Sequence, residues 1–269
     1  MNAEYPVEQG LEAVEMIRGL PVSTLGLDAT VRLLLHWVSH PEGLRFFACV
    51  NAHSAEVAHR DARFMEALRT ANLLVADGAG VVLASMILGG RVRERATGPD
   101  LFMAVSRALD RLGHRSVFYL GGTPQTLERI AARHREVFPN LAIAGMYSPP
   151  FRTAFASDDL DAMADAVSRA APDVLWVGLG APKQEKLLLD LRSRLEVPLC
   201  GPVGAMFDYF AGNVVMPPKW VERCGLHWLH RLLKDPHRLW RRNLDSPLFL
   251  AHVMRDRLRR RRKVSGRQE

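Results

Sequence analysis

The stretch Asn72-Leu73-Leu74-Val75-Ala76-Asp77-Gly78-Ala79-Gly80 decides the fold that this sequence predicts. Leu73 to Ala76 is a short apolar run typical of a buried parallel strand, Asp77-Gly78 ends it, and Val81 to Leu88 has the composition of a packed helix. Asp77 therefore stands at the carboxyl end of a strand, the edge of an open α/β sheet where ligands bind. Asp is also a good helix N-cap, and spacing alone favours neither role.

Apolar runs, polar or glycine-rich turns and amphipathic stretches alternate along the rest of the chain. Strands are expected at 44–50, 73–76, 116–120, 141–146, 174–177 and 198–203, and helices at 27–38, 54–69, 81–88, 101–112, 125–137 and 158–170. Asp28 is expected to cap the first helix. This alternation predicts an α/β fold: a Rossmann-like parallel sheet with right-handed crossovers and helices on both faces.

Composition changes near Gly212. Pro217-Pro218 interrupts the pattern, and Trp220, Trp228 and Trp240 then appear among His and Arg residues without a further strand. We therefore expect a Rossmann-like core over residues 1–212 and a helical, Arg-rich appendage over residues 213–269.

Charge is concentrated in the appendage. The net charge of the 269 residues is +7, and residues 231–267 alone carry thirteen Arg or Lys against three Asp, so the remainder is net acidic. A partner with dense negative charge should meet the protein at its C-terminal end. Three cysteines without paired spacing indicate a reducing compartment, and neither a signal peptide nor a spanning segment is predicted, which points to the cytoplasm.

Polar or glycine-rich turns follow four of the expected strands, at Asn51, Asp77, Gly121-Gly122 and Gly178 to Gln184. Such glycines let backbone N–H groups approach a phosphate, which predicts a nucleotide or sugar-phosphate ligand. Neither glycine turn has the full dinucleotide fingerprint or a Walker lysine pattern. A single glycine turn more often only separates strand from helix, whereas several on one sheet edge favour binding.

Three further polar residues have a structural and a functional interpretation. Lys183 and Gln184 begin a helix, where they could cap it or face solvent, and Arg95 could be a solvated loop residue. In the functional interpretation the Arg95 guanidinium neutralises phosphate. Lone histidines such as His53 and His114 are expected to be structural or surface groups, and no metal-ligand pattern is found.

Five motifs in order resemble the WecG/TagA/CpsF glycosyltransferase family over residues 45–243. They are Asn51-Ala52-His53, Leu74 to Val82, Arg95 to Asp100, Pro172 to Glu185 and Gly204 to Gly212. The resemblance implies a Rossmann-like inverting enzyme that moves a sugar, such as an N-acetylhexosamine, mannose or a related uronic acid, from a UDP-sugar to a polyprenyl-diphosphate-linked saccharide. Members make cell-surface polymers at the inner leaflet. Neither a metal nor another cofactor is expected.

The resemblance also implies roles for single residues. Asp77 would be the general base that takes the proton of the acceptor hydroxyl. Substrate-binding roles are implied for Cys49, Asn51, Arg95, Gly121, Gly122, Gly180, Lys183, Gln184, Asp208, Arg231, Arg238 and Arg241. Two positions depart from the family: Cys49 stands where many members have Thr, and His227 where Glu is common, which puts the roles of those groups in doubt.

The appendage resembles the membrane-facing segment of the family. Its arginines 231, 238 and 241 would meet diphosphates at the site, and the basic run Arg255 to Lys263 would attract an anionic membrane surface at about 1 kcal/mol per charge. A solvated charge run is the alternative. The expected location is therefore cytoplasmic, peripheral on the inner face of the plasma membrane, with a homo-oligomer left open.

Two other classes are weighed against this one. A nucleotide-dependent oxidoreductase could use the same sheet, but the Gly-x-Gly-x-x-Gly turn is missing after the first strand. A nucleic-acid-binding protein could use the Arg-rich tail, but the recognition elements of known modules are missing, so no nucleic-acid partner is expected.

Overall fold

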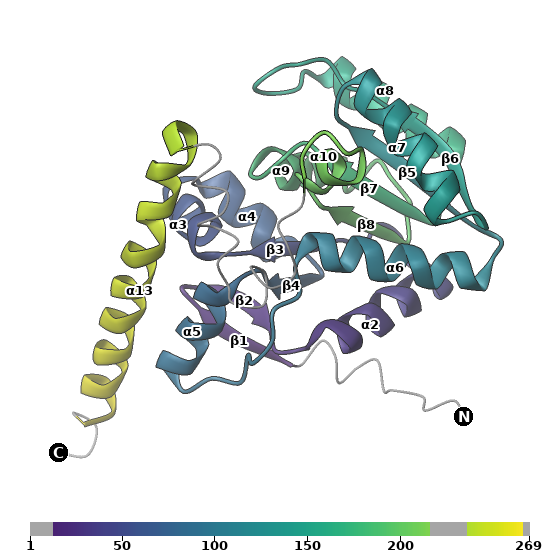
Figure 1. The fold of residues 1–269 in the computed structure, drawn as a ribbon. Helices are drawn as coiled ribbons and strands as arrows, with labels where there is room; N and C mark the ends of the chain where they lie inside the picture. The colour runs from purple at the N-terminus through teal and green to yellow at the C-terminus, as the bar shows by residue number, and fades with distance from the viewer. Residues whose placement is uncertain (1–12, 216–235, 266–269) are drawn as a thin grey trace, which may run out of the picture.

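The structure is a computed structural model that describes residues 13–215 and 236–265. Strands and helices alternate along most of this length (Figure 1). Their bounds are β1 Val14–Ile17, β2 Leu20–Ser23, α2 Leu27–Ser39, β3 Phe47–Val50, α3 Ala52–Arg60, α4 Ala62–Thr70, β4 Leu73–Ala76, α5 Ala79–Leu88, α6 Gly98–Leu112, β5 Arg115–Gly121, α7 Pro124–Val137, β6 Leu141–Tyr147, α8 Ser157–Ala170, β7 Val174–Gly178, α9 Lys183–Leu191, β8 Leu199–Pro202, α10 Met206–Phe210 and α13 Pro236–Ser265.

A parallel sheet organises the described chain. Four strands pair in the order β6-β5-β7-β8, and β3 and β4 form a second parallel pair. A parallel bridge between Phe46 and Cys200, with a 2.8 Å hydrogen bond from Cys200 N to Arg45 O, joins the β3 side to the β8 edge. The α/β class and the parallel sheet are therefore confirmed. Because these strands run in one direction, their carboxyl ends share one edge.

Both faces of the sheet carry a hydrophobic core. Successive strand residues alternate between two buried clusters, as Leu74 and Ala76 do against Leu73 and Val75. One cluster contains side chains of α3, α4, α5, α8, α9 and α13, and the other contains side chains of α2, α6, α7 and α10. Burial on both faces explains why the strands are continuous apolar runs.

Several local expectations are wrong. Residues 54–69 form two helices, because Asp61 leaves the helical conformation at φ −135° and its side chain caps α4 by accepting from Phe64 N at 3.1 Å. The hairpin of β1 and β2, which the sequence did not predict, turns at Arg18 and Gly19, both with positive φ (51° and 75°). The N-cap of α2 is Gly26, while Asp28 lies in the first turn.

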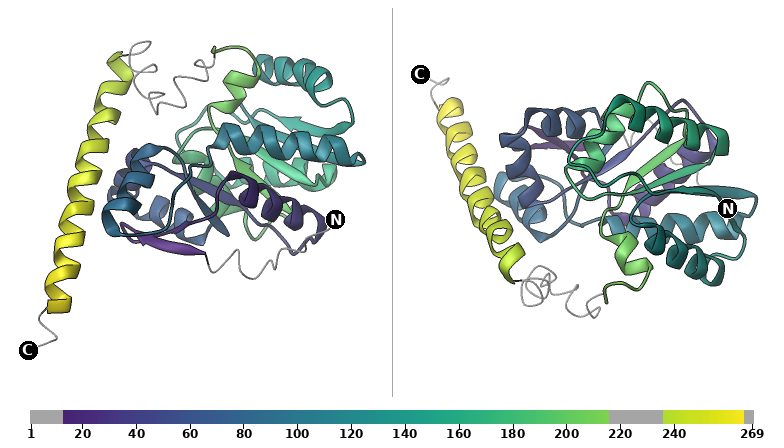
Figure 2. Two further views of the ribbon diagram at one scale, coloured as in Figure 1. Left: turned by 60° about the horizontal axis from the view of Figure 1, so that its bottom comes forward. Right: turned by 90° about the horizontal axis from the view of Figure 1, so that it is seen from above.

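Helix α13 packs along one side of the core, against α3 and α5 (Figures 1 and 2). Phe249 and Val253 of α13 are fully buried in the same cluster as the side chains of α3 and α5. The described end of the expected appendage is therefore helical and contributes to the core, whereas the division at residue 212 stays a prediction. None of the described helices has the length and apolar content needed to cross a membrane.

Candidate functional site

Asn51 and Asp77 meet where β3 and β4 end. The Asp77 N–H donates to Val50 O at 2.8 Å, which places the two strand ends side by side, and Asn51 Nδ2 lies 3.5 Å from Asp77 Oδ2. The other end of the Asn51 side chain is fixed by a capping box, in which Asn51 Oδ1 accepts from Ser54 N at 3.0 Å. The N-cap of α5 is Gly78, at φ 112°, and not Asp77.

Carboxyl groups surround the Cys49 thiol. Burial raises the pKa of Cys49 well above its ordinary value, and the negative charges of Asp77, Glu185 and Asp100 raise it further. A Cβ atom on Gly98, the first residue of α6, would lie 3.7 Å from Cys49 Sγ, so α6 begins beside this thiol. The sheet edge therefore gathers acidic groups around the end of β3, from the residue after β4 and from α6 and α9.

Gln184 connects the ends of β7 and β8. Its side chain is buried at 5 % exposure, and Gln184 Oε1 accepts from Gly180 N at 3.1 Å. A Cβ atom on Gly204, which follows β8, would lie 3.4 Å from Gln184 Oε1. The structure thus brings Gln184, Gly180 and the turn after β8 together, as the shared sheet edge predicts.

The sequence interpretation missed Glu185 as a member of the site. Its side chain is 1 % exposed, and burial raises the pKa of Glu185 to about 7, although the hydrogen bond from Gln184 opposes this shift. Glu185 Oε1 accepts from Gln184 Nε2 at 2.9 Å, and Oε2 is buried without a hydrogen-bond partner among the described residues. Helical spacing could have indicated this burial, because Glu185 lies three residues before the buried Leu188 and therefore on the same face of α9.

The two glycine turns are glycine-rich for different reasons. Gly121 has φ 121°, and a Cβ atom there would lie 2.6 Å from Gly178 O, so close packing of β5 against β7 excludes any side chain. Gly180 has φ 77°, but a Cβ atom there would meet no atom of the described residues within 4 Å. The described residues therefore leave one side of the Gly180 turn uncovered, where a ligand could approach its backbone.

Arg95 lies beside the Asp77 strand end. The Ala96 N–H donates to Ala76 O at 2.9 Å, which joins the loop before α6 to the end of β4.

Lys183 and Asp208 contact residues that are not among the predicted site residues. Lys183 Nζ donates to Arg152 O and lies 4.2 Å from the Phe155 ring centroid.

Asp208 is exposed on α10, and its Oδ1 accepts from Asn213 Nδ2 at 3.1 Å. This contact ties α10 to the loop that follows it. The substrate-binding roles of Lys183 and Asp208 remain predictions.

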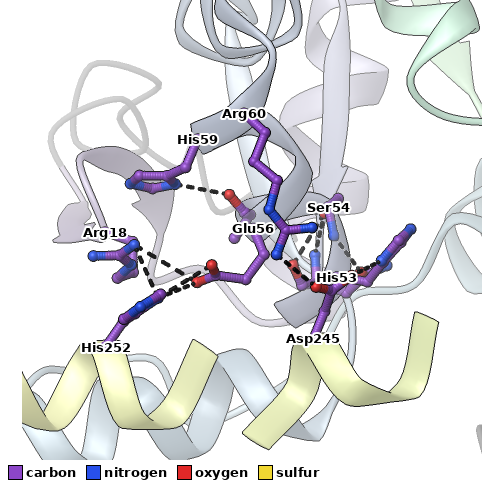
Figure 3. Close-up of polar contacts among 10 residues, drawn as sticks. Arg18, His53, Ser54, Glu56, His59, Arg60, Asp245 and His252 are labelled. Carbon is purple, nitrogen blue, oxygen red and sulfur yellow. Dashed lines mark hydrogen bonds and ion pairs between the residues drawn. The ribbon is translucent and has the colours of Figure 1, made fainter. Parts of the chain in front are cut away.

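His53, expected to be structural, joins α3 to α13. Its Nδ1–H donates to Asp245 Oδ2 at 2.6 Å, and Arg60 Nη2 donates to Asp245 Oδ1 at 2.9 Å (Figure 3). Burial opposes ionisation of Asp245, yet the hydrogen bonds from His53 and Arg60 hold the pKa of Asp245 below its ordinary value. These contacts hold α13 against His53, which follows Asn51 by two positions in the sequence.

A second polar cluster fixes α13 further along. Glu56, a buried residue of α3, faces His252 Nδ1 at 3.1 Å and Arg18 Nη2 at 3.6 Å (Figure 3). Arg18 also pairs with Asp256 of α13 at 3.2 Å. The hairpin of β1 and β2 is thus linked to α13 as well. Together the two clusters fix both the position and the axial register of the helix.

The predicted arginines of the appendage fall only partly within the described residues. The backbone of α13 contains Arg238 and Arg241, about 10 Å and 6 Å along the helix axis from Asp245 at 1.5 Å per residue. Arg231 and His227 lie outside the described residues.

Nothing in the described part of the chain forms a group of three or more His, Cys, Asp or Glu side chains that could hold a metal ion. A surface hollow of about 520 Å³ is lined by α7 and β6, and it includes none of the predicted site residues. The chemistry available at the sheet edge is thus that of a placed carboxylate, an amide beside it and a backbone turn open to a ligand.

The sequence was compared with known proteins. Residues 15–263 match the family described as "Glycosyl transferase WecG/TagA/CpsF family". A relative from Bacillus subtilis (strain 168), named N-acetylglucosaminyldiphosphoundecaprenol N-acetyl-beta-D-mannosaminyltransferase, is 29% identical over 243 residues, which cover 90% of this chain and 91% of the relative. Proteins of the same name from Bacillus spizizenii (30% over 236 residues; 85% and 89% covered) and Staphylococcus aureus strain MW2 (26% over 208 residues; 77% and 79% covered) are also similar.

The matched residues include both the sheet edge and most of α13. Because the matching family is one of glycosyltransferases, the comparison does not support the oxidoreductase alternative. The protein is a glycosyltransferase, and the chain belongs to the WecG/TagA/CpsF family.

Proposed function

We propose that the protein transfers N-acetylmannosamine, with inversion, from its UDP-sugar to N-acetylglucosamine linked through a diphosphate to a polyprenol. The names of the similar proteins support this substrate pair, since they specify a β-mannosaminyl product and an undecaprenyl-diphosphate acceptor. Such a product would serve the synthesis of a cell-wall polymer. N-acetylmannosamine is an N-acetylhexosamine, which is one of the donor sugar classes expected from the sequence.

In the proposed reaction, Asp77 takes the proton of the acceptor hydroxyl while that oxygen forms a bond to the anomeric carbon. The bond between this carbon and the UDP oxygen breaks on the opposite face, and UDP leaves with the electron pair, which inverts the configuration. A general base must lie within hydrogen-bond reach of the proton that it removes. The position of Asp77 at a strand end, in contact with Asn51, suits this requirement because its backbone is fixed.

Negative charge develops on the diphosphate as UDP leaves. The backbone of the Gly180 turn, the Arg95 guanidinium and the appendage arginines 231, 238 and 241 are the groups proposed to stabilise it. Gly180 supports this assignment because its turn, beside Gln184, is left uncovered by the described residues. Cys49, Gly121, Gly122, Lys183 and Asp208 remain proposed members of the pocket wall.

The acceptor's polyprenol requires the enzyme to work at a membrane. We propose that the appendage holds the protein on the inner face of the plasma membrane. The described end of α13 supports this, since Met254 and Leu258 are exposed beside Arg255 and Arg259.

The contact of Asp77 with Asn51 at the shared sheet edge carries the proposal. Asp77→Asn should abolish release of UDP and formation of the disaccharide lipid while UDP-sugar binding, measured by calorimetry, stays within a few-fold of wild type. Asp190→Asn, on a surface pair with Arg63, is the matched control and should keep full activity. Near-normal turnover by Asp77→Asn would remove the general-base role.

A further inference from the structure

The buried carboxyl group of Glu185 lies at the site, but the proposed reaction does not use it. One of its oxygens accepts from Gln184 Nε2 at 2.9 Å, and the other has no hydrogen-bond partner among the described residues. A carboxyl group buried with half of its hydrogen-bonding capacity unused destabilises a fold. Packing alone is therefore a poor reason for an acidic side chain at this position of α9.

The side-chain amide of Gln184 is held from both ends. Its Oε1 accepts from Gly180 N, and its Nε2 donates to Glu185 Oε1. Because an amide NH₂ cannot accept and a carbonyl oxygen cannot donate, these partners select one of the two amide orientations. With an apolar side chain in place of Glu185, the orientation would lose one of its two determinants.

The orientation of the Gln184 amide also constrains the backbone of the Gly180 turn. Gly180 N–H is bound by the amide oxygen, and the ideal Cβ position of Gly204 lies 3.4 Å from that same oxygen. The Gln184 amide therefore lies between the turns after β7 and β8. If the amide rotated, its NH₂ group would face the Gly180 N–H, and the two donors would push the turn away.

We infer that Glu185 is a positioning residue for sugar transfer, which holds the Gln184 amide and, through it, the Gly180 turn in the arrangement that receives the donor diphosphate; this role rests on the proposed function. Glu185 acts through Gln184 and does not touch the reacting atoms.

Two variants of Glu185 separate the hydrogen bond from the charge. Glu185→Gln keeps an oxygen that can accept from Gln184, whereas Glu185→Leu has a similar size and no acceptor. We expect Glu185→Gln to change KM for the UDP-sugar by less than about threefold, and Glu185→Leu to raise it about tenfold with a smaller change in kcat. Asp173→Asn is the control, because it replaces one of the two carboxylate oxygens that accept from Arg115 and Ser116 at the opposite edge of the sheet. It should leave KM unchanged.

A second measurement does not depend on turnover. The side-chain NH₂ resonance of Gln184, identified by its loss in Gln184→Met, can be followed by NMR in glutamine-labelled protein. It should be protected from solvent exchange in wild type and in Glu185→Gln, and shifted and rapidly exchanging in Glu185→Leu. If wild type turns over no UDP-sugar, the proposed function fails, whereas this resonance still tests the position of the amide.

The role of Glu185 is overturned by a Glu185→Leu variant with the wild-type Gln184 resonance. It is equally overturned by a Glu185→Gln variant that loses kcat a hundredfold at unchanged KM, because Glu185 would then act on the reacting atoms.

Discussion

Asp245 and His53 are joined by a 2.6 Å hydrogen bond across 192 residues of sequence. The bond connects α13 to the first turn of α3, which begins directly after Asn51. The C-terminal helix α13 is therefore held in a fixed position beside the end of β3, where the candidate site lies. Any motion of α13 along its axis must first break this contact and the one between Asp245 and Arg60.

Asp245→Asn should loosen α13 and lower the free energy of unfolding by about 1–3 kcal/mol, the usual size of hydrogen bonds to a charged group. The pKa of Asp245 is lower in the folded state, so its stabilisation is present above the ordinary value of 3.8 and disappears as pH falls through the folded pKa. Hydrogen exchange of α13 at pH 7 and urea unfolding at pH 7 and pH 3 measure this. Asp161→Asn, in an exposed pair with Arg194, is the control. Equal exchange of α13 in wild type and Asp245→Asn would contradict the prediction.

Phe249→Ala should destabilise the protein by about 3–5 kcal/mol, because this fully buried side chain of α13 fills the core against α3 and α5. Thermal or urea unfolding gives the value. Leu248→Ala, at the neighbouring exposed position, should change stability by less than about 0.5 kcal/mol. If both variants were equally stable, α13 would contribute no core in solution.

Asn51→Ser should separate the two functions of Asn51. Serine keeps an oxygen for the helix cap but cannot reach Asp77, so stability should stay near wild type while kcat falls several-fold. Asn51→Ala loses the cap as well and should cost about 1 kcal/mol of stability in addition. Unfolding curves and steady-state kinetics on all three proteins measure this. Unchanged kcat in Asn51→Ser would mean that the amide does not orient Asp77.

The reactivity of Cys49 reports its distance from Asp77 without any substrate. The negative charge of Asp77 helps to raise the pKa of the Cys49 thiol, so Asp77→Asn should lower that pKa and increase the thiolate fraction. Alkylation of Cys49 at pH 8.5, followed by peptide mass spectrometry, should then be several-fold faster. Asp190→Asn should leave the rate unchanged. A rate that did not respond to Asp77→Asn would place the two groups too far apart to interact.

Glu185 should make stability depend on pH between about 4.5 and 7. Burial raises its pKa from 4.5 to about 7 in the folded state, so the unfolded chain holds fewer protons in this window and stability falls as pH rises through it. The loss should be on the order of 3 kcal/mol and level off above the folded pKa. Glu185→Gln cannot titrate and should lack this slope when its urea unfolding is compared with wild type at pH 4.5, 6 and 8. Parallel profiles of the two proteins would contradict a raised pKa.

Apolar periodicity was enough to locate the strands of the parallel sheet. The run from Leu73 to Ala76 is β4 as predicted, because a strand buried on both faces needs apolar side chains at every position. The turns after β3, β4 and β7 could be placed on one edge for the same reason. The helix break at Asp61 was missed because the side-chain cap of α4 outweighs a continuous helical pattern.

The sequence by itself determined the α/β class, the shared edge of the strand ends, and Asp77 and Gln184 as polar residues on that edge, since these follow from local patterns and from the parallel arrangement. Only the tertiary structure decided the contact of Asn51 with Asp77, the burial that raises the pKa of Glu185, and the docking of α13 through Asp245 and His53. Each of these depends on which side chains from distant elements share a low-dielectric space, and spacing along a single chain does not encode that proximity.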